Sequence, residues 1–282
     1  MRLAGTCSRY SASAMPQLTM AATYHGLADR FFRWPYHAIV MKTFEAASST
    51  IVCSERGTAA SMVIDKLSGA ADGPPPRILH ADSHCVLADK PAGLLCVPGR
   101  GEDKQDCLSG RVQALYPDAL IVHRLDMATS GLCLFARGAD MQRRLSEAFA
   151  RREVRKTYAA IVQGTPGNAH GEIDLPLLVD WPNRPRQVVD HGRGKPSLTR
   201  WWSEGPGPIA GTTRLRLEPV TGRSHQLRVH LLAIGHPIVG DALYAPAEVA
   251  AASPRLLLHA AGLELMHPAT GEPVRWSSAA PF

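Results

Sequence analysis

Short apolar runs separated by polar turns begin at residue 77 and predict a series of strands. Over 213–217 arginine and leucine alternate, which is the period of two expected of a half-buried strand. The segment 256–276 is predicted to form two strands, because the turn-forming residues 268–271 divide it. The other predicted strands cover residues 78–79, 85–88, 119–122, 131–136 and 158–162.

Two segments have the apolar spacing of helices. One covers residues 226–234 and is expected to end at Gly235, with Pro237 behind it. Asp140 is predicted to cap the other helix. The apolar face of this second helix consists of Met141, Leu145, Ala148 and Phe149, and its opposite face carries Arg143, Arg144, Arg151 and Arg152.

The order of these elements mixes strands and helices without the regular strand–helix–strand repeat of a parallel sheet. This order predicts an α+β fold with a mixed, mostly antiparallel central sheet flanked by helices. No internal repeat with the period of a solenoid protein is present.

Residues 1–76 differ from the rest in their pattern of apolar and polar residues and are expected to form a poorly ordered N-terminal extension. Their apolar stretches keep no sustained period, and the tract Gly73-Pro74-Pro75-Pro76 closes them. Residues 77–282 are therefore predicted to form the folded domain. A translation start assigned too far upstream is an alternative explanation of the extension, because it contains Met1, Met15, Met20, Met41 and Met62.

Charge and cysteine content narrow the class of protein. The 282 residues have a formal net charge of +6 and a pI of about 9.1. Such an excess fits a polyanionic partner such as nucleic acid, but it fits a basic protein without one equally well. The six cysteines form no C-x-x-C pair, so we expect no zinc site and reduced thiols in a cytoplasmic protein. No apolar run approaches the ~20 residues that a membrane span needs.

The segment 123–132, H-R-L-D-M-A-T-S-G-L, is the strongest candidate for chemistry. It places Asp126 between two apolar residues directly after a predicted strand, where a rigid scaffold presents reactive groups. A shielded carboxylate is costly unless a cation or hydrogen-bond donors meet it. The simpler interpretation is that Asp126 caps a turn or pairs with Arg124, and spacing alone favours it.

A second polar cluster, T-G-R-S-H-Q-L-R-V-H at 221–230, opens the last predicted helix. It supplies Arg223, His225, Gln226 and Arg228. One interpretation is a solvated basic helix face. The other is that one arginine meets Asp126 while others bind phosphate, two tasks for which guanidinium is suited.

Several motifs, in this order, resemble those of the RluA family of bacterial pseudouridine synthases: K-P-A-G-L, H-R-L-D followed by T-S-G, R-K-T-Y, T-G-R-S-H-Q-L-R-V-H, G-H-P-I-V-G-D and L-L-L-H-A. The resemblance extends from about Arg77 to the C-terminus. D-W-P-N-R-P at 180–185 and V-P-G-R at 97–100 are similar to the subgroup that modifies 23S rRNA and the tRNA anticodon stem-loop. Members of this subgroup have no S4 RNA-binding domain, and residues 1–76 show no such pattern.

The resemblance implies a pseudouridine synthase fold with a catalytic cleft, in which Asp126 is the catalytic residue. Tyr158 and Arg228 match the family's tyrosine and arginine. Arg124 would contact RNA and take the place of the extruded nucleotide. The reaction gains and loses no atoms, so we expect neither cofactor nor metal. A monomer that binds rRNA and tRNA is expected, with RNA contacts from Arg223, His225, Gln226, Arg143, Arg144, Arg151 and Arg152.

Two other functions fit the sequence less well. A non-catalytic RNA-binding protein fits the basic charge, but the complete set of Asp126, Tyr158 and Arg228 argues against it. A metal-dependent hydrolase would need paired ligands, and His225 and His230, five residues apart, do not share a helix face. A structural hydrogen-bonding role is preferred for His123 over that of a general base.

Overall fold

The computed structural model describes residues 74–282. The expected N-terminal extension lies outside the described residues, apart from the three prolines that lead into the first strand. Cys7 and Cys53 lie outside them too. The four described cysteines are free and buried, as expected: Cys85, Cys96, Cys107 and Cys133. No helix of the described part is long and apolar enough to cross a membrane.

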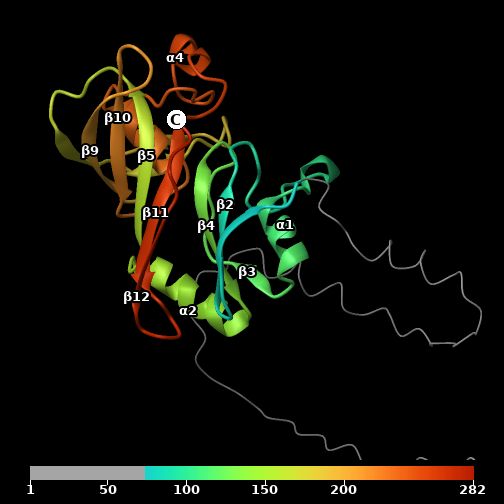
Figure 1. The fold of residues 1–282 in the computed structure, drawn as a ribbon. Helices are drawn as coiled ribbons and strands as arrows, with labels where there is room; N and C mark the ends of the chain where they lie inside the picture. Colours follow the sequence, from blue (N-terminus) through green and yellow to red (C-terminus); the bar gives the residue numbers. More distant parts are fainter. Residues whose placement is uncertain (1–73) are drawn as a thin grey trace, which may run out of the picture. The chain divides into compact units, whose positions relative to one another are not determined.

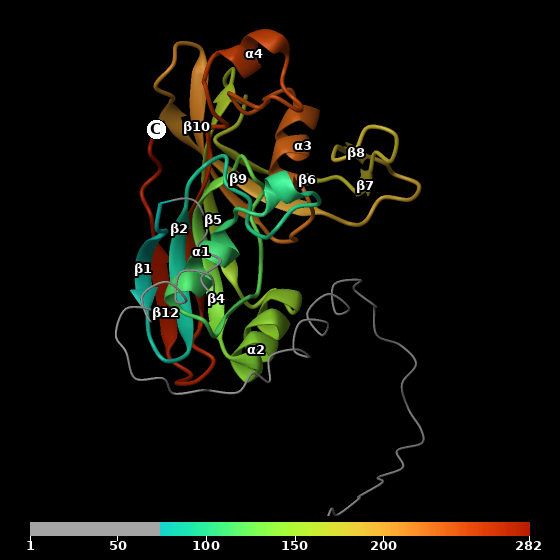
Figure 2. The same ribbon diagram turned by 90° about the vertical axis from the view of Figure 1, so that its right-hand side faces the viewer.

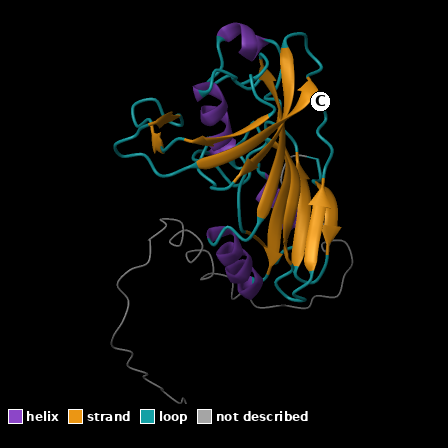
Figure 3. Ribbon diagram, turned by 90° about the vertical axis from the view of Figure 1, so that its left-hand side faces the viewer, coloured by secondary structure: helices purple, strands orange, loops and turns teal. Residues whose placement is uncertain are grey.

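A single ten-stranded sheet forms the framework of residues 74–282 (Figures 1 and 3). Only β4 and β11 pair in parallel, and every other neighbouring pair is antiparallel, which confirms the predicted α+β class. Along the sheet the order is β1 (Arg77–Ala81), β2 (Cys85–Lys90), β4 (Ser130–Arg137), β11 (Leu258–Met266), β5 (Arg155–Gln163), β10 (Thr212–Pro219), β9 (Leu198–Pro206) and β6 (His170–Asp174). At its margins β3 (Ala119–Ile121) pairs with β4, and β12 (Pro273–Ser277) pairs with β11.

The helices cover the sheet on both faces. Alternate residues of β4 explain this: Cys133 and Phe135 pack with α1 (Leu108–Leu115), whereas Leu132 and Leu134 pack with α2 (Ala139–Ala150). Because successive side chains of a strand point to opposite faces, α1 and α2 lie on opposite sides of β4. The remaining described helices are α3 (Gln226–Ala233), α4 (Ala247–Ala251) and the 3-10 turn η2 (Glu102–Lys104).

Helix α3 packs on the other half of the sheet. Its Leu227 and Leu231 contact Leu215 and Leu217 of β10, the apolar half of the alternating segment 213–217. A small second sheet, β7 (Leu177–Val179) and β8 (Gln187–Val189), forms a hairpin that projects beside α3 (Figure 2). Tyr158 of β5 packs against both the core cluster under α3 and the core cluster under α1, so it lies where these two parts of the core meet.

One predicted helix cap is wrong. Helix α2 begins at Ala139, and its N-cap is Gly138 with φ +77°, which makes no side-chain capping bond. Asp140 instead lies in the first turn, where its carboxylate pairs with Arg143 at 2.8 Å and Arg144 at 2.9 Å. An acid at this position still interacts favourably with the helix dipole, so the residue stabilises the helix start by charge rather than by capping.

The parallel pairing of β4 and β11 depends on a glycine. A Cβ on Gly131 would lie 2.3 Å from the carbonyl oxygen of Ala260, and Gly131 has φ +111°. We therefore expect Gly131→Ala to lower the free energy of unfolding by at least about 3 kcal/mol, because both backbone strain and steric overlap result. Urea denaturation measures this. Gly167→Ala is the matched control, since a Cβ there meets nothing within 4 Å; equal losses in both variants would contradict the prediction.

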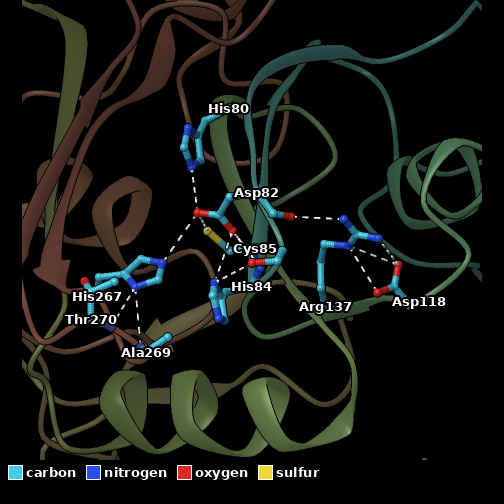
Figure 4. A network of polar contacts seen from close by, with 10 residues as sticks. His80, Asp82, His84, Cys85, Asp118, Arg137, His267, Ala269 and Thr270 are labelled. Atoms are coloured by element: carbon cyan, nitrogen blue, oxygen red, sulfur yellow. Dashed lines mark hydrogen bonds and ion pairs between the residues drawn. The ribbon is translucent and has the colours of Figure 1, made fainter.

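The turn between β1 and β2 and the turn between β11 and β12 are joined by a polar network around Asp82 (Figure 4). Its carboxylate bonds to the His80 ring at 3.0 Å and accepts the backbone N–H groups of His84 and Cys85, each at 2.7 Å. His267 brings its Nε2 within 3.5 Å from the other turn. Burial alone would raise the pKa of Asp82, but these hydrogen bonds hold it well below the ordinary value.

Candidate active site

The loop between β3 and β4 presents the H-R-L-D motif. Leu125 is buried and holds the loop against the core cluster under α1, while Arg124 is exposed. The Asp126 side chain is 22% exposed, so it reaches solvent from a largely enclosed position. Its backbone carbonyl accepts the Thr129 N–H at 3.1 Å, which closes a tight turn immediately before β4. The chain thus fixes Asp126 by its backbone and leaves the carboxylate free.

Lys90 holds the loop between β3 and β4 in place from the buried side. Its Nζ is buried and donates to the carbonyl oxygens of Pro91 at 2.9 Å, Leu94 at 2.7 Å and Met127 at 2.9 Å. Burial lowers the pKa of Lys90 to about 8, so the ammonium still carries three protons at neutral pH. One side chain therefore ties the K-P-A-G-L segment to the residue after Asp126. Sequence analysis did not assign this positioning role, although the motif itself was noticed.

Arg228 faces Asp126 from helix α3. Of the two interpretations of the segment 221–230, the structure therefore agrees with an arginine that meets Asp126 rather than with a solvated basic helix face. Its Nη1 lies 3.9 Å from Asp126 Oδ2, and the residue is only 4% exposed. Asp241 orients the guanidinium through two bonds, at 2.8 Å from Nε and 2.5 Å from Nη2. This bidentate pair leaves the third nitrogen directed at Asp126. Asp241 is the last residue of G-H-P-I-V-G-D, and sequence analysis missed its role.

His225 and Tyr244 complete the surroundings of the carboxylate. The Tyr244 hydroxyl oxygen accepts the Gln187 N–H at 2.8 Å and lies 2.6 Å from His225 Nδ1, so the hydroxyl donates to the ring. The ring proton is then on Nε2, which lies 3.9 Å from Asp126 Oδ1. Burial lowers the pKa of His225 although Asp126 opposes this, which keeps the ring neutral. Tyr244 gave no recognised signal in the sequence.

Tyr158 lies on β5, half-buried beside the same carboxylate. Burial, together with the negative charge of Asp126, raises its pKa far above the ordinary value for tyrosine. The phenol therefore stays protonated at any physiological pH. It offers a flat ring and a neutral hydroxyl, so stacking and hydrogen bonding are the chemistry open to it.

Residues 84–233 match the family model described as RNA pseudouridylate synthase, which is more than half of the chain. The chain belongs to the RluA family of RNA pseudouridine synthases. It is 49% identical to the dual-specificity RNA pseudouridine synthase RluA of Escherichia coli K12, over 73% of this chain and 93% of that protein. The Yersinia pestis RluA is 47% identical, over 73% and 99% of the two chains. Human RNA pseudouridylate synthase domain containing 1 is structurally similar, with a TM-score of 0.63 and 27% identity over 73% of this chain and 84% of that one.

The predicted RNA contacts of this synthase fall in three places. Arg124 and Arg223 are exposed, and Arg124 lies two residues from Asp126. Arg143 and Arg144 are exposed on α2, whereas Arg151 and Arg152 are exposed just beyond its last residue, where Arg151 pairs with Glu147 at 2.7 Å. Helix α2 starts beyond the far end of β4 and runs back until Phe149 stacks on His123 at 4.5 Å. Arg151 and its neighbour Arg152 are therefore nearer the H-R-L-D loop than Arg143 and Arg144.

Gln226 does not fit its predicted RNA contact. The residue is 3% exposed, its amide oxygen accepts from Thr221 at 2.7 Å and from the Arg223 N–H at 3.0 Å, and its amide nitrogen donates to Leu198 and Thr199, both at 3.0 Å. Both ends of the amide are thus occupied inside the protein. We assign Gln226 to holding the start of α3, which in turn positions Arg228.

His123 of the synthase is a neutral structural residue in this geometry. Its Nε2 accepts the Leu134 N–H at 2.9 Å, and burial together with Lys156 lowers its pKa to about 3. The unfolded histidine has a pKa of about 6.5, so its contribution to stability is complete above that value and falls as the pH drops toward 3.

We expect the free energy of unfolding to fall by about 2–3 kcal/mol between pH 7 and pH 4 on account of His123. His123→Gln keeps an acceptor for the Leu134 N–H and does not titrate, so its free energy of unfolding should fall less between pH 7 and pH 4. Urea denaturation across this pH range compares the two proteins. Parallel curves would show that His123 is not the buried neutral group.

Around Asp82, two groups of side chains among residues 74–282 gather as in a metal site: His80, Asp82 and Cys85, and Asp82, His84 and His267. In the first group, burial and Asp82 raise the pKa of the Cys85 thiol to about 12, so the thiol stays protonated and does not supply a thiolate ligand. The tautomer of His267 argues against that use. Its Nδ1 accepts the N–H groups of Ala269 at 3.4 Å and Thr270 at 3.3 Å, so the proton is on Nε2, which faces Asp82 (Figure 4). A protonated nitrogen cannot ligate a metal. The network is better explained as a polar link between two turns, in which His267 Nε2 lies 3.5 Å from the Asp82 carboxylate.

Proposed function

We propose that this synthase uses Asp126 to isomerise uridines in two RNA classes, 23S rRNA and the tRNA anticodon stem-loop. The observation that supports the catalytic assignment is the approach of Arg228 Nη1 to within 3.9 Å of Asp126, with the guanidinium locked by Asp241. A carboxylate beside a fixed cation is favoured in its ionised form, which either attack on the nucleotide or removal of a ribose proton requires.

The remaining steps need a base that has left its stack. The N1–C1′ bond of uridine breaks, the uracil turns and C5 bonds to C1′. The proton leaves C5, and N1 takes up a proton, so that no atoms are gained or lost. Tyr158 provides the flat surface on which an extruded uracil can stack. Arg124 is exposed on the loop between β3 and β4 and can occupy the place in the RNA that the extruded nucleotide leaves. Extrusion costs a few kcal/mol, and phosphate contacts by exposed arginines offset it.

The choice of RNA rests on the relatives. The two bacterial relatives named above are called dual-specificity, and D-W-P-N-R-P at 180–185 and V-P-G-R at 97–100 are the segments that link this chain to their subgroup. Action on these substrates would require a cytoplasmic enzyme, which is the location that we propose. One chain supplies Asp126, Arg228 and Tyr158, so we propose that a monomer is active.

Release of tritium from C5-labelled uridine tests the proposal, because only a bond from C5 to C1′ displaces that hydrogen. The full-length protein is incubated separately with labelled 23S rRNA and labelled tRNA anticodon stem-loop. We expect release from both. An RNA-binding protein without activity would bind both and release none, and release from one RNA alone would contradict dual specificity.

A further inference from the structure

The β7–β8 hairpin carries the most exposed large apolar side chain of residues 74–282. Trp181 is 68% exposed at the loop that joins the two strands. The guanidinium of Arg184 lies over its ring, 4.1 Å from the centroid. The pair forms a flat platform with one covered face and one open face, and the hairpin that carries it projects away from the main sheet (Figure 2).

The base of the hairpin is anchored to the catalytic centre. Leu177 of β7 packs with Val229 of α3 and with Tyr244. The Gln187 N–H of β8 bonds to the Tyr244 hydroxyl, which in turn bonds to His225 beside Asp126. The position of Trp181 is therefore set by the same residues that set the position of the catalytic groups.

The charge of the hairpin favours a polyanion rather than an apolar protein partner. Residues 180–195 contain two acids, Asp180 and Asp190, against four cations, Arg184, Arg186, Arg193 and Lys195. Arg186 extends the aromatic contacts toward the site, since its guanidinium lies 5.4 Å from the centroid of the Tyr244 ring. Aromatic rings interleaved with arginines are the composition of surfaces that bind single-stranded nucleic acid.

We propose that Trp181 stacks on an unpaired base of the RNA substrate outside the catalytic centre, and that Arg184 stiffens the ring from behind. Every base has a flat face, so stacking of this kind tolerates many sequences. Stacking on Trp181 would require an unpaired base at a set distance from the target uridine. Both 23S rRNA and the tRNA anticodon stem-loop can meet this requirement. The inference rests on the proposed action on RNA.

The experiment measures binding and chemistry separately. Binding of a synthetic anticodon stem-loop is measured by fluorescence anisotropy with Trp181→Ala, Trp181→Phe and Trp202→Ala, each in the Asp126→Asn protein so that no turnover occurs. Trp202 is the matched control because it too is a tryptophan covered by an arginine, with the Arg216 guanidinium 3.9 Å from its ring centroid. Arg216 alternates with Leu215 and Leu217, which pack against α3, so it points to the opposite face of β10. Single-turnover rates at saturating RNA are measured with the same substitutions in the wild-type background.

We expect Trp181→Ala to raise the Kd about tenfold, with a smaller rise for Trp181→Phe and no change for Trp202→Ala. The rate at saturating RNA should stay the same, because Trp181 touches no reacting atom. An unchanged Kd in Trp181→Ala, or an equal rise in Trp202→Ala, overturns the inference. Failure of the proposed function is separate: the wild-type protein would then release no tritium, while the binding comparison could still be read.

Discussion

Replacing Asp126 with asparagine is expected to lower the rate of pseudouridine formation by at least about a thousandfold while RNA binding largely survives. The amide has nearly the same shape as the carboxylate but neither attacks as a nucleophile nor accepts a proton at neutral pH. Its side chain is partly exposed, and its contacts with Arg228 and His225 are long, at 3.9 Å each. The fold therefore does not depend on its charge. Tritium release and anisotropy measure the two quantities.

Asp103→Asn is the matched control for this substitution. The Asp103 side chain is 75% exposed, and its nearest cation, Lys104, is 3.9 Å away. We expect its activity to equal that of the wild type. If the Asp126→Asn protein still formed pseudouridine at a comparable rate, another group would have to be the catalytic carboxylate.

Replacing Arg228 with methionine is expected to remove activity and to lower the free energy of unfolding by about 3–5 kcal/mol. Both losses have one origin in the structure. The guanidinium is 4% exposed and forms two bonds with Asp241, which is 1% exposed. Without its partner the Asp241 carboxylate is left buried and uncompensated. Urea denaturation gives the loss of stability, and tritium release at a temperature where the variant is folded gives the loss of activity.

A double variant separates the two roles of Arg228. Asp241→Asn keeps an oxygen for the N–H groups of Leu243 and Tyr244, which Asp241 accepts at 3.0 Å and 3.2 Å, but removes the charge. We expect Arg228→Met combined with Asp241→Asn to regain more than half of the lost stability, because no unpaired charge remains buried. Activity should stay lost, because Arg228 is the only arginine or lysine of residues 74–282 within 4.0 Å of the Asp126 carboxylate. Recovery of activity together with stability would show that the guanidinium serves the fold alone.

Most strands and the helices α2 and α3 were predictable because their apolar periods are local, whereas α1, α4 and the strands β6 to β9 were not predicted. The alternation over 213–217 marked β10, and the interrupted segment 256–276 marked β11 and β12. The start of α2 was predicted wrongly, since Asp140 has the residue type of a cap while Gly138 occupies that position with a positive φ. The pattern of residue types could not distinguish these two ways of beginning a helix.

The candidate site was predictable in part. The motifs identified Asp126, Tyr158 and Arg228, because these residue types in this order are specific to a family. They did not distinguish residues that face the Asp126 carboxylate from residues that hold such residues in place. Gln226 lies in the same motif as Arg228 but is buried with its amide fully bonded, and Asp241 was not assigned although it orients the guanidinium.

The sequence by itself determined the class of fold, the family and the identity of the carboxylate and the arginine, since each is written in a local pattern of residues. Only the tertiary structure decided which groups surround them. Lys90 bonds the Met127 carbonyl because β2 pairs with β4. Arg228, held by Asp241, meets Asp126 because α3 packs on β10. Such contacts depend on the register and packing of distant segments, which no local period specifies.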